Sequence, residues 1–259
     1  MLPRSGVASA TRYTSRLTRA WRLMRVAAHF VQAAGVAGFG YPLMKPARRR
    51  LALQRWSAKL VRHLAGRLTV HGEPPRHHEA PFMLVANHVS WLDIFVINAA
   101  VPTRFVAKSE VRAWPLVGWL CVKADTLFIE RECRRDLARL DELIVDTLRE
   151  SASMGVFLEG TTTDGREVLP FHSSLLRPAQ QVNVPVYPVA IQYRRSDGSL
   201  CTEAAYDGDK SALDTLRLML TQREIHVHVH FLPPLAAAGV HRKVLARQAR
   251  ESIVQRLFP

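Results

Sequence analysis

The sequence predicts an α/β protein with a mixed, largely parallel sheet flanked by helices. Two observations favour this class. In most of the chain beyond residue 72, short apolar runs alternate with segments whose apolar residues recur at every third or fourth position. This alternation is typical of a sheet that helices cover. The 259 residues, of which 48% are apolar and 22% charged, are enough for one large domain with a full core.

The expected strands and helices follow one another along the chain. Each strand is a short apolar run, and each helix carries an apolar stripe. Strands are expected at 81–87, 104–107, 126–129, 155–158, 184–193 and 225–231. Helices are expected at 90–100, 134–151 and 240–257, and the second of these carries Leu137, Leu140, Ile144 and Leu148 on one face.

The charge of the chain is concentrated near its N-terminus. The formal net charge is +14, and no Asp or Glu precedes Glu73, whereas fourteen Lys and Arg residues lie between Arg4 and Arg67. The remaining chain holds 22 basic and 22 acidic residues and is formally neutral. A neutral body with one basic segment indicates that this segment meets an anionic surface. A basic tail that is merely solvated is the alternative.

Two stretches of the basic segment suit a bilayer surface. Residues 26–44 are uncharged and nearly long enough to span a bilayer, but polar, glycine and proline residues interrupt them, which favours an interfacial or re-entrant helix. Residues 48–67 have helical periodicity, with Leu53, Trp56 and Leu60 on one face and basic residues on another. Each basic residue near an anionic surface contributes about 1 kcal/mol. The alternatives are a secretory signal peptide and a helix packed on the protein body.

The histidines of the last expected strand invite a metal hypothesis that the sequence does not support. His226, His228 and His230 alternate along the strand and therefore share one face, which we expect to be the wet one. No carboxylate or cysteine completes a ligand set with them. The three cysteines of the chain lie far apart without Cys-x-x-Cys spacing, so no disulfide framework is expected. We expect no metal site.

A histidine and an aspartate after the first apolar strand form a candidate catalytic pair. Five positions separate His88 from Asp93, and this offset turns them apart on one continuous helix. A turn can bring them together, because the strand ends at Asn87 and the spacing of Ser90 and Asp93 is that of a helix capping box. A carboxylate that holds the imidazole in one tautomer makes it a general base for a hydroxyl. In the alternative, Asp93 only caps the helix.

A turn rich in glycine and threonine follows the strand at 155–158. Gly160 permits close approach of the backbone to a ligand, and Thr161 and Thr162 offer hydroxyl and N–H groups to an anion such as phosphate. The chain lacks the Gly-Lys-Ser/Thr of a P-loop and the Gly-x-Ser-x-Gly of a serine hydrolase, so both classes lose support. An ordinary turn is the alternative.

Four motifs together resemble those of the glycerolipid acyltransferases, the 1-acyl-glycerol-3-phosphate acyltransferase group. In the order and approximate spacing of that family stand Asn87-His88-x4-Asp93, Thr126-Leu-Phe-Ile-Glu-Arg131, Phe157-Leu-Glu-Gly-Thr161 and Val184-Pro-Val-Tyr-Pro188. The resemblance covers about residues 81–234. It implies transfer of a fatty acyl group from a thioester of coenzyme A or acyl carrier protein to the hydroxyl of a lysolipid, without a further cofactor.

The resemblance also assigns roles to residues. His88 is implied as the base that activates the acceptor hydroxyl for direct attack on the thioester carbonyl, and Asp93 as the group that orients it and stabilises the imidazolium. Arg131 and Lys108 match basic positions expected at the acceptor's phosphate. The residues expected to shape the acceptor site are Glu159, Gly160 and Thr161.

The resemblance and the charge pattern together predict a membrane-docking helical segment at residues 1–72 and an acyltransferase domain at 73–259. We expect the protein at the cytoplasmic face of the inner membrane, peripheral or monotopic, with an anionic membrane surface, a lysolipid and an acyl thioester as partners and no nucleic acid. The expected acceptor is 1-acyl-sn-glycerol-3-phosphate, which gives phosphatidic acid. Because residues 159–174 are similar to both groups, lyso-ornithine lipid is the alternative. The non-enzyme alternative is a module that binds anionic surfaces or nucleic acid.

Overall fold

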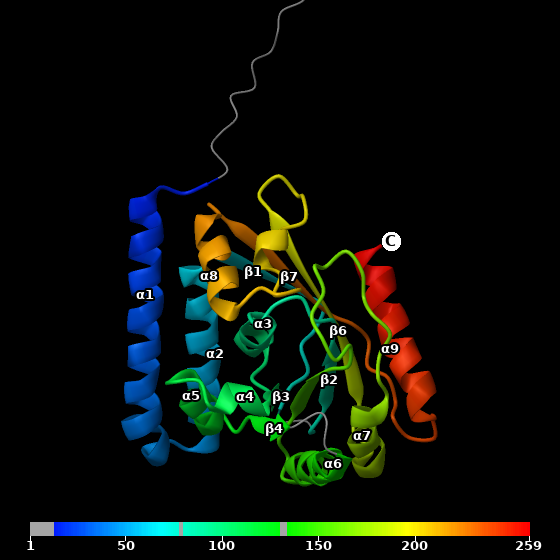
Figure 1. Ribbon diagram of the computed structural model, residues 1–259. Helices are drawn as coiled ribbons and strands as arrows, with labels where there is room; N and C mark the ends of the chain where they lie inside the picture. Colours follow the sequence, from blue (N-terminus) through cyan, green and yellow to red (C-terminus); the bar gives the residue numbers. More distant parts are fainter. Residues whose placement is uncertain (1–12, 78–79, 130–133) are drawn as a thin grey trace, which may run out of the picture.

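The strands pair into one sheet in the computed structural model, which describes residues 13–77, 80–129 and 134–259 (Figure 1). Within these residues the strands are β1 (Gly66–His71), β2 (Met83–Ala86), β3 (Arg104–Lys108), β4 (Leu127–Ile129), β5 (Met154–Phe157), β6 (Val186–Arg195) and β7 (Ile225–Phe231). Their order is β1-β7-β6-β2-β5-β3-β4, and neighbours are parallel except for β6 and β7. The expected mixed, largely parallel sheet is therefore confirmed.

Helices cover both faces of this sheet (Figure 1). They are α1 (Arg16–Gly35), α2 (Pro46–His63), α3 (Asp93–Ala100), α4 (Ser109–Arg112), α5 (Val117–Lys123), α6 (Arg134–Arg149), α7 (Arg177–Val182), α8 (Ala212–Thr221) and α9 (Arg242–Leu257), with short 3-10 turns η3 (Ser174–Leu176) and η4 (Thr202–Ala204). Buried side chains of α2, α3 and α8 form one core with residues of the sheet. Those of α6, α7 and α9 pack on other residues of the sheet and form cores that are separate from the first. β2 lies between β5 and β6 and is buried along its whole length.

Several elements differ in extent from the sequence-based expectation. The helix expected at 48–67 is α2, which ends at His63, because Ala65 adopts a left-handed φ of 63° and the chain then enters β1. The helix expected from residue 90 begins at Asp93. β1 is not among the expected strands, yet it pairs with β7. The sheet therefore begins within the segment 1–72.

The N-terminal helices form a pair beside the sheet. α1 continues into the π-helical turn η1 (Val36–Gly40) and the 3-10 turn η2 (Tyr41–Leu43), after which α2 returns along α1 (Figure 1). The His29 ring stacks on Trp56 at 4.8 Å between centroids, and Trp56 Nε1 donates to the His29 carbonyl at 3.2 Å. Phe39 and Leu43 in the connection are 85% and 88% exposed. Among the described residues, no helix has both the length and the apolar character that a bilayer crossing needs.

The histidine face of β7 is less wet than expected. His226 and His228 are partly exposed, but His230 is buried. The His230 ring stacks on His71 at 4.2 Å between centroids and accepts a hydrogen bond from Arg256 Nε at 3.0 Å. Burial, with Arg256 as the next cause, lowers the pKa of His230 to about 4, so this ring is neutral at physiological pH.

Gly72, which follows β1, is a position where a side chain has no room. A Cβ there would stand 2.2 Å from the Phe231 carbonyl oxygen, and φ is 73°. We expect Gly72→Ala to lower the free energy of unfolding by about 2 to 4 kcal/mol in urea titrations. Gly198→Ala is the matched control, because φ is 80° but nothing lies within 4 Å; it should cost only about 1 kcal/mol. Equal losses would contradict the steric explanation.

Candidate active site

The candidate catalytic pair lies after the carboxyl end of β2, in the turn that leads into α3. His88 Nδ1 lies 2.8 Å from Asp93 Oδ2, so the prediction that the two side chains meet across a turn is confirmed. The Asp93 side chain is fully buried, whereas 19% of the His88 side chain is exposed. The Phe157 ring stacks on the imidazole with centroids 3.9 Å apart. Because Nδ1 faces Asp93, Nε2 is the ring atom available to a substrate.

The Asp93 carboxylate is surrounded by hydrogen-bond donors. Oδ2 accepts from His88 Nδ1 and from the backbone N–H groups of Val89 and Ser90 at 2.8 and 2.9 Å. Oδ1 accepts from the Tyr193 hydroxyl at 2.6 Å. The bond from Ser90 is the carboxylate half of the predicted capping box, so Asp93 both caps the turn and binds His88. A carboxylate at Nδ1 fixes the tautomer that leaves Nε2 unprotonated, which is the form of a general base.

Asn87 connects this turn to β6. Its side-chain Nδ2 donates to the Ile191 carbonyl at 3.0 Å, and its Oδ1 accepts from the Ile191 N–H at 2.7 Å. Asn87 therefore continues the pairing of β2 and β6 beyond the last backbone pair, and it fixes the point at which the chain leaves the sheet. His88 follows directly, so its backbone position depends on this side-chain pairing.

Glu159 ties the turn after β5 to the backbone of His88. One carboxylate oxygen accepts from the His88 N–H and the other from the Leu169 N–H, both at 2.7 Å, and Glu159 is 4% exposed. Burial raises the pKa of Glu159 to about 7, although both N–H groups lower it. The carboxylate thus supports the catalytic turn, a contact that the expectation of an acceptor-shaping role does not include.

The residues after Glu159 also face the catalytic turn. Gly160 has a φ of 76°, which glycine adopts without strain. The Thr163 N–H donates to the His88 carbonyl at 2.9 Å, and the Thr162 hydroxyl donates to the Tyr206 carbonyl. Gly160 and Thr161 line the same cavity as His88. The structure therefore brings these predicted residues together with the pair, while their contact with an acceptor stays a prediction.

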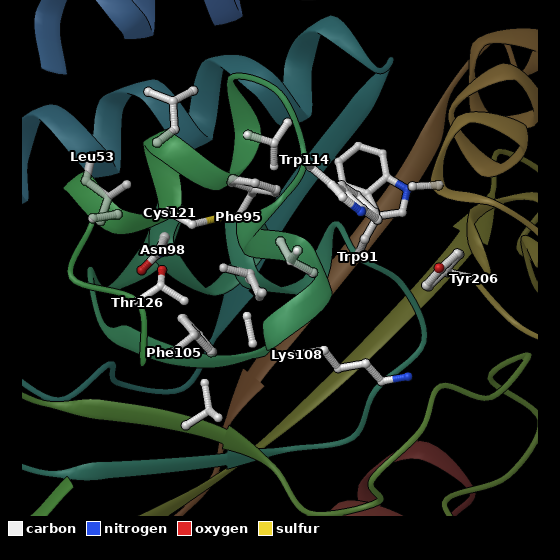
Figure 2. A pocket seen from close by; sticks show the side chains of 18 of the residues that line it. Leu53, Trp91, Phe95, Asn98, Phe105, Lys108, Trp114, Cys121, Thr126 and Tyr206 are labelled. Atoms are coloured by element: carbon white, nitrogen blue, oxygen red, sulfur yellow. The ribbon is translucent and has the colours of Figure 1, made fainter. Parts of the chain in front are cut away.

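Of the two predicted basic residues, Lys108 and Arg131, the structure describes Lys108. Lys108 ends β3, is exposed, lines the cavity and extends away from the apolar side chains in Figure 2. Arg131 lies outside the described residues. Where β3 and β4 begin, at the opposite ends of these strands from Lys108, Arg104 pairs with Asp125 at 3.2 Å. The guanidinium of Arg104 is therefore already matched by a carboxylate.

A cavity of about 1590 Å³ opens beside His88. Its walls come from the helices α1 to α6 and α8, from the strands β3 and β4 and from the turns after β2 and β5. Most of the lining is apolar, and Figure 2 shows Phe95, Phe105, Trp91 and Trp114 around it. Its volume exceeds the roughly 300–1,000 Å³ of a pocket for a drug-sized ligand. A mostly apolar space of this size next to a polar pair suits a long apolar chain that carries a polar reacting group.

Two residues that contact the pair, Phe157 and Tyr193, are not among the predicted site residues. Phe157 stacks on His88, and its place two residues before Glu159, at the end of an apolar strand, is a signal that could have been used. Tyr193 contacts Asp93 from a strand one hundred positions later. No local pattern links the two positions, because only the order of strands in the sheet makes them neighbours.

The chain is similar in sequence to known acyltransferases. Residues 67–192 match the family model described as Acyltransferase. A lyso-ornithine lipid O-acyltransferase of Pseudomonas aeruginosa is 41% identical over 213 residues, which cover 82% of this chain and 80% of that protein. A 1-acyl-sn-glycerol-3-phosphate acyltransferase of Neisseria meningitidis is 32% identical over 183 residues, or 70% and 71% of the two chains.

A solved structure with the same fold supports this arrangement of strands and helices. The crystal structure of the 1-acyl-sn-glycerophosphate acyltransferase PlsC from Thermotoga maritima superposes with a TM-score of 0.68 and covers 92% of this chain and 96% of that one. The sequence identity is 23%. The match supports the arrangement of strands and helices described above.

Glu159 gives the stability of the protein a defined pH dependence. Its pKa is about 7 in the folded chain against an ordinary value of 4.5, so between these values only the folded state keeps the proton. The contribution of Glu159 to the free energy of unfolding is therefore fully present below pH 4.5 and is lost as the pH rises through about 7. The loss amounts to at most about 3 kcal/mol. We expect the unfolding free energy of the wild type to fall over this range relative to Glu159→Gln, measured by urea titration at several pH values.

Glu251→Gln is the control for this titration, because the Glu251 side chain is 55% exposed. It should follow the wild-type pH dependence. A wild-type curve parallel to that of Glu159→Gln from pH 4.5 to 8 would disprove the assignment.

Proposed function

The chain belongs to the acyltransferase family that includes lyso-ornithine lipid and 1-acyl-sn-glycerol-3-phosphate acyltransferases, and from this premise we propose that it acylates the hydroxyl of lyso-ornithine lipid. That it is an acyltransferase of the lysophospholipid type follows from its relatives. The observation that carries the proposal of a reaction site is the contact between His88 and Asp93 beside a large apolar cavity. The acceptor, the donor and the membrane are parts of the proposal.

The choice of acceptor is supported by the degree of similarity. The relative named for lyso-ornithine lipid is 41% identical, whereas the relative named for 1-acyl-sn-glycerol-3-phosphate is 32% identical. Lys108 at the cavity favours 1-acyl-sn-glycerol-3-phosphate as the second candidate.

The proposed reaction needs one base and no covalent enzyme intermediate. His88 Nε2 takes the proton of the acceptor hydroxyl while its oxygen attacks the thioester carbonyl carbon. The Asp93 carboxylate stabilises the imidazolium that forms. When the tetrahedral intermediate collapses, the carbon–sulfur bond breaks and the thiolate leaves with the proton from Nε2. The products are the acylated lipid and the free thiol of coenzyme A or acyl carrier protein, and His88 is again neutral.

The cavity provides a place for fatty chains in this reaction. Apolar residues of α5, α6 and β4 line one part, namely Leu120, Ile129 and Leu140, and residues of α1 and α8 line another. We propose that the acyl chain of the donor lies in this cavity, because burial of apolar surface drives its binding at about 25 cal/mol per Å². A cavity that begins at His88 also keeps bulk water from the reacting carbonyl, which disfavours hydrolysis of the thioester.

The N-terminal helix pair supports association with a membrane. Exposed apolar residues lie along α1 and in the connection to α2, among them Leu17, Trp21, Val31, Phe39 and Leu43. Basic residues accompany them in both helices. Trp and other apolar side chains enter the interfacial layer while Arg and Lys meet anionic headgroups. We propose that this pair docks the protein on the cytoplasmic face of the inner membrane, where its lipid substrate lies.

The first test supplies purified protein with acyl-CoA or acyl carrier protein thioesters and with either lysolipid. We expect acylation of lyso-ornithine lipid, and a fall in kcat of about 10²- to 10⁴-fold for His88→Ala, because a general base contributes that much. His226 lies on β7, and His226→Ala should keep the kcat of the wild type. Full acyl transfer by His88→Ala would refute the proposed chemistry. If the wild type acylates 1-acyl-sn-glycerol-3-phosphate faster than lyso-ornithine lipid, the proposed acceptor is wrong.

The second test concerns the membrane. Phe39 lies in the exposed connection of α1 and α2. We expect Phe39→Ser to weaken binding to vesicles of phosphatidylglycerol and phosphatidylethanolamine by about tenfold, measured by flotation. Phe258→Ser changes the same residue type, 41% exposed, at the other end of the chain and should leave binding unchanged. Equal binding by both variants would count against docking through the helix pair.

A further inference from the structure

Tyr193 lies behind the catalytic pair, on the side away from the substrate cavity. It belongs to β6 and is 1% exposed. Its hydroxyl donates to Asp93 Oδ1 at 2.6 Å. Tyr193 is absent from the residues that line the cavity in the described chain. The hydrogen bond to Asp93 is therefore the contact that joins the Tyr193 side chain to the catalytic pair.

The two oxygens of Asp93 have different partners. Oδ2 receives the His88 ring and two backbone N–H groups, whereas the donor recorded for Oδ1 among the described residues is Tyr193. A carboxylate bound at one oxygen only can rotate about its Cβ–Cγ bond. The phenol at the second oxygen fixes that torsion, and therefore also fixes the direction of the hydrogen bond between Asp93 Oδ2 and His88 Nδ1.

The phenol stays a donor over the working pH range. Burial, followed by the charge of Asp93, raises the pKa of Tyr193 well above its ordinary value, so the hydroxyl keeps its proton. A hydrogen bond from a neutral phenol to a buried carboxylate is charge-assisted and therefore short and strong. The 2.6 Å distance is in the range of such bonds.

The backbone of Tyr193 is held in register with the catalytic turn. Asn87 pairs through its side chain with Ile191, two positions before Tyr193 on β6. The Tyr193 carbonyl accepts from the Cys201 N–H at 2.9 Å. The strand that carries the phenol is thus joined to the residue that precedes His88, and the phenol cannot shift without disturbing this pairing.

We propose that Tyr193 is a positioning residue of the acyl transfer, which holds the Asp93 carboxylate in the orientation that serves His88 and shares its negative charge. This inference rests on the proposed function. When His88 takes the acceptor proton, the imidazolium is stabilised by Asp93 at fixed distance and angle. Loss of the phenol leaves Oδ1 buried without that donor, and both the rate and its pH dependence change.

Other titratable groups near the pair are accounted for. Glu159 reaches the His88 backbone N–H from the turn after β5, and Cys201 lies near Tyr193 with its pKa raised to about 12 by burial. Lys108, Glu110 and His172 line the same cavity as His88. A change confined to the Tyr193 hydroxyl leaves all of these in place, so a shift in the variant reports on Asp93 and His88.

The test compares Tyr193→Phe with the wild type in kcat, KM and pH profile. We expect kcat to fall about 10- to 100-fold, the worth of a hydrogen bond to a charged group, with KM within about twofold. We also expect the acid side of the kcat profile to move up by about half a pH unit, because Asp93 without the phenol attracts the imidazolium more strongly. Tyr187→Phe on the same strand is the control and should match the wild type.

A second readout does not need catalysis. The rate at which diethyl pyrocarbonate modifies His88, followed by mass spectrometry against pH, should show the same upward shift in Tyr193→Phe. A kcat within twofold of the wild type overturns the inference, and so does a fall in kcat without either shift, which would mean a structural role only. If the wild type acylates neither lysolipid, the proposed function fails, and the modification profile still decides whether Tyr193 acts on the pair.

Discussion

The site depends on one buried carboxylate. Removing the charge of Asp93 from water costs several kcal/mol, and the cost is offset only if each oxygen finds donors. The donors are a ring nitrogen, two backbone N–H groups and a phenol, and they come from the turn after β2 and from β6. The turn therefore closes in one conformation. The position of the His88 imidazole follows from that of the carboxylate.

The order of the central strands supplies these donors and the second support of the turn. β2 and β5 are parallel neighbours, so the turns that follow them, with His88 and Glu159, meet at one edge of the sheet. β6 is the other neighbour and extends further than β2, which brings its later residues beside the turn. Three segments distant in the sequence thus hold one histidine. Two of them contact its backbone N–H or its carboxylate partner, through Glu159 and Tyr193.

The surroundings of the pair join two kinds of environment. On one side, His88 faces an apolar cavity, and on the other it contacts a fully buried carboxylate. The helices α1 and α2 form part of the cavity wall and also carry exposed apolar and basic residues. A lipid substrate that enters from a bilayer would pass from one apolar environment to another. The helices that are proposed to dock on the membrane are then also part of the substrate site.

The α/β class, most of the strands and a contact between His88 and Asp93 across a turn could be predicted from the sequence, because apolar periodicity and a five-residue spacing are local properties. The sequence also placed Gly160 and Thr161 after a strand end. β1, the support of His88 by Glu159 and the contact of Tyr193 with Asp93 could not be predicted from it. These depend on which strands are neighbours, and strand order is set by packing over the whole chain, which short segments do not encode. The candidate base could therefore be predicted from the seven residues 87–93, whereas the groups that hold it in place become its neighbours only when the sheet is assembled.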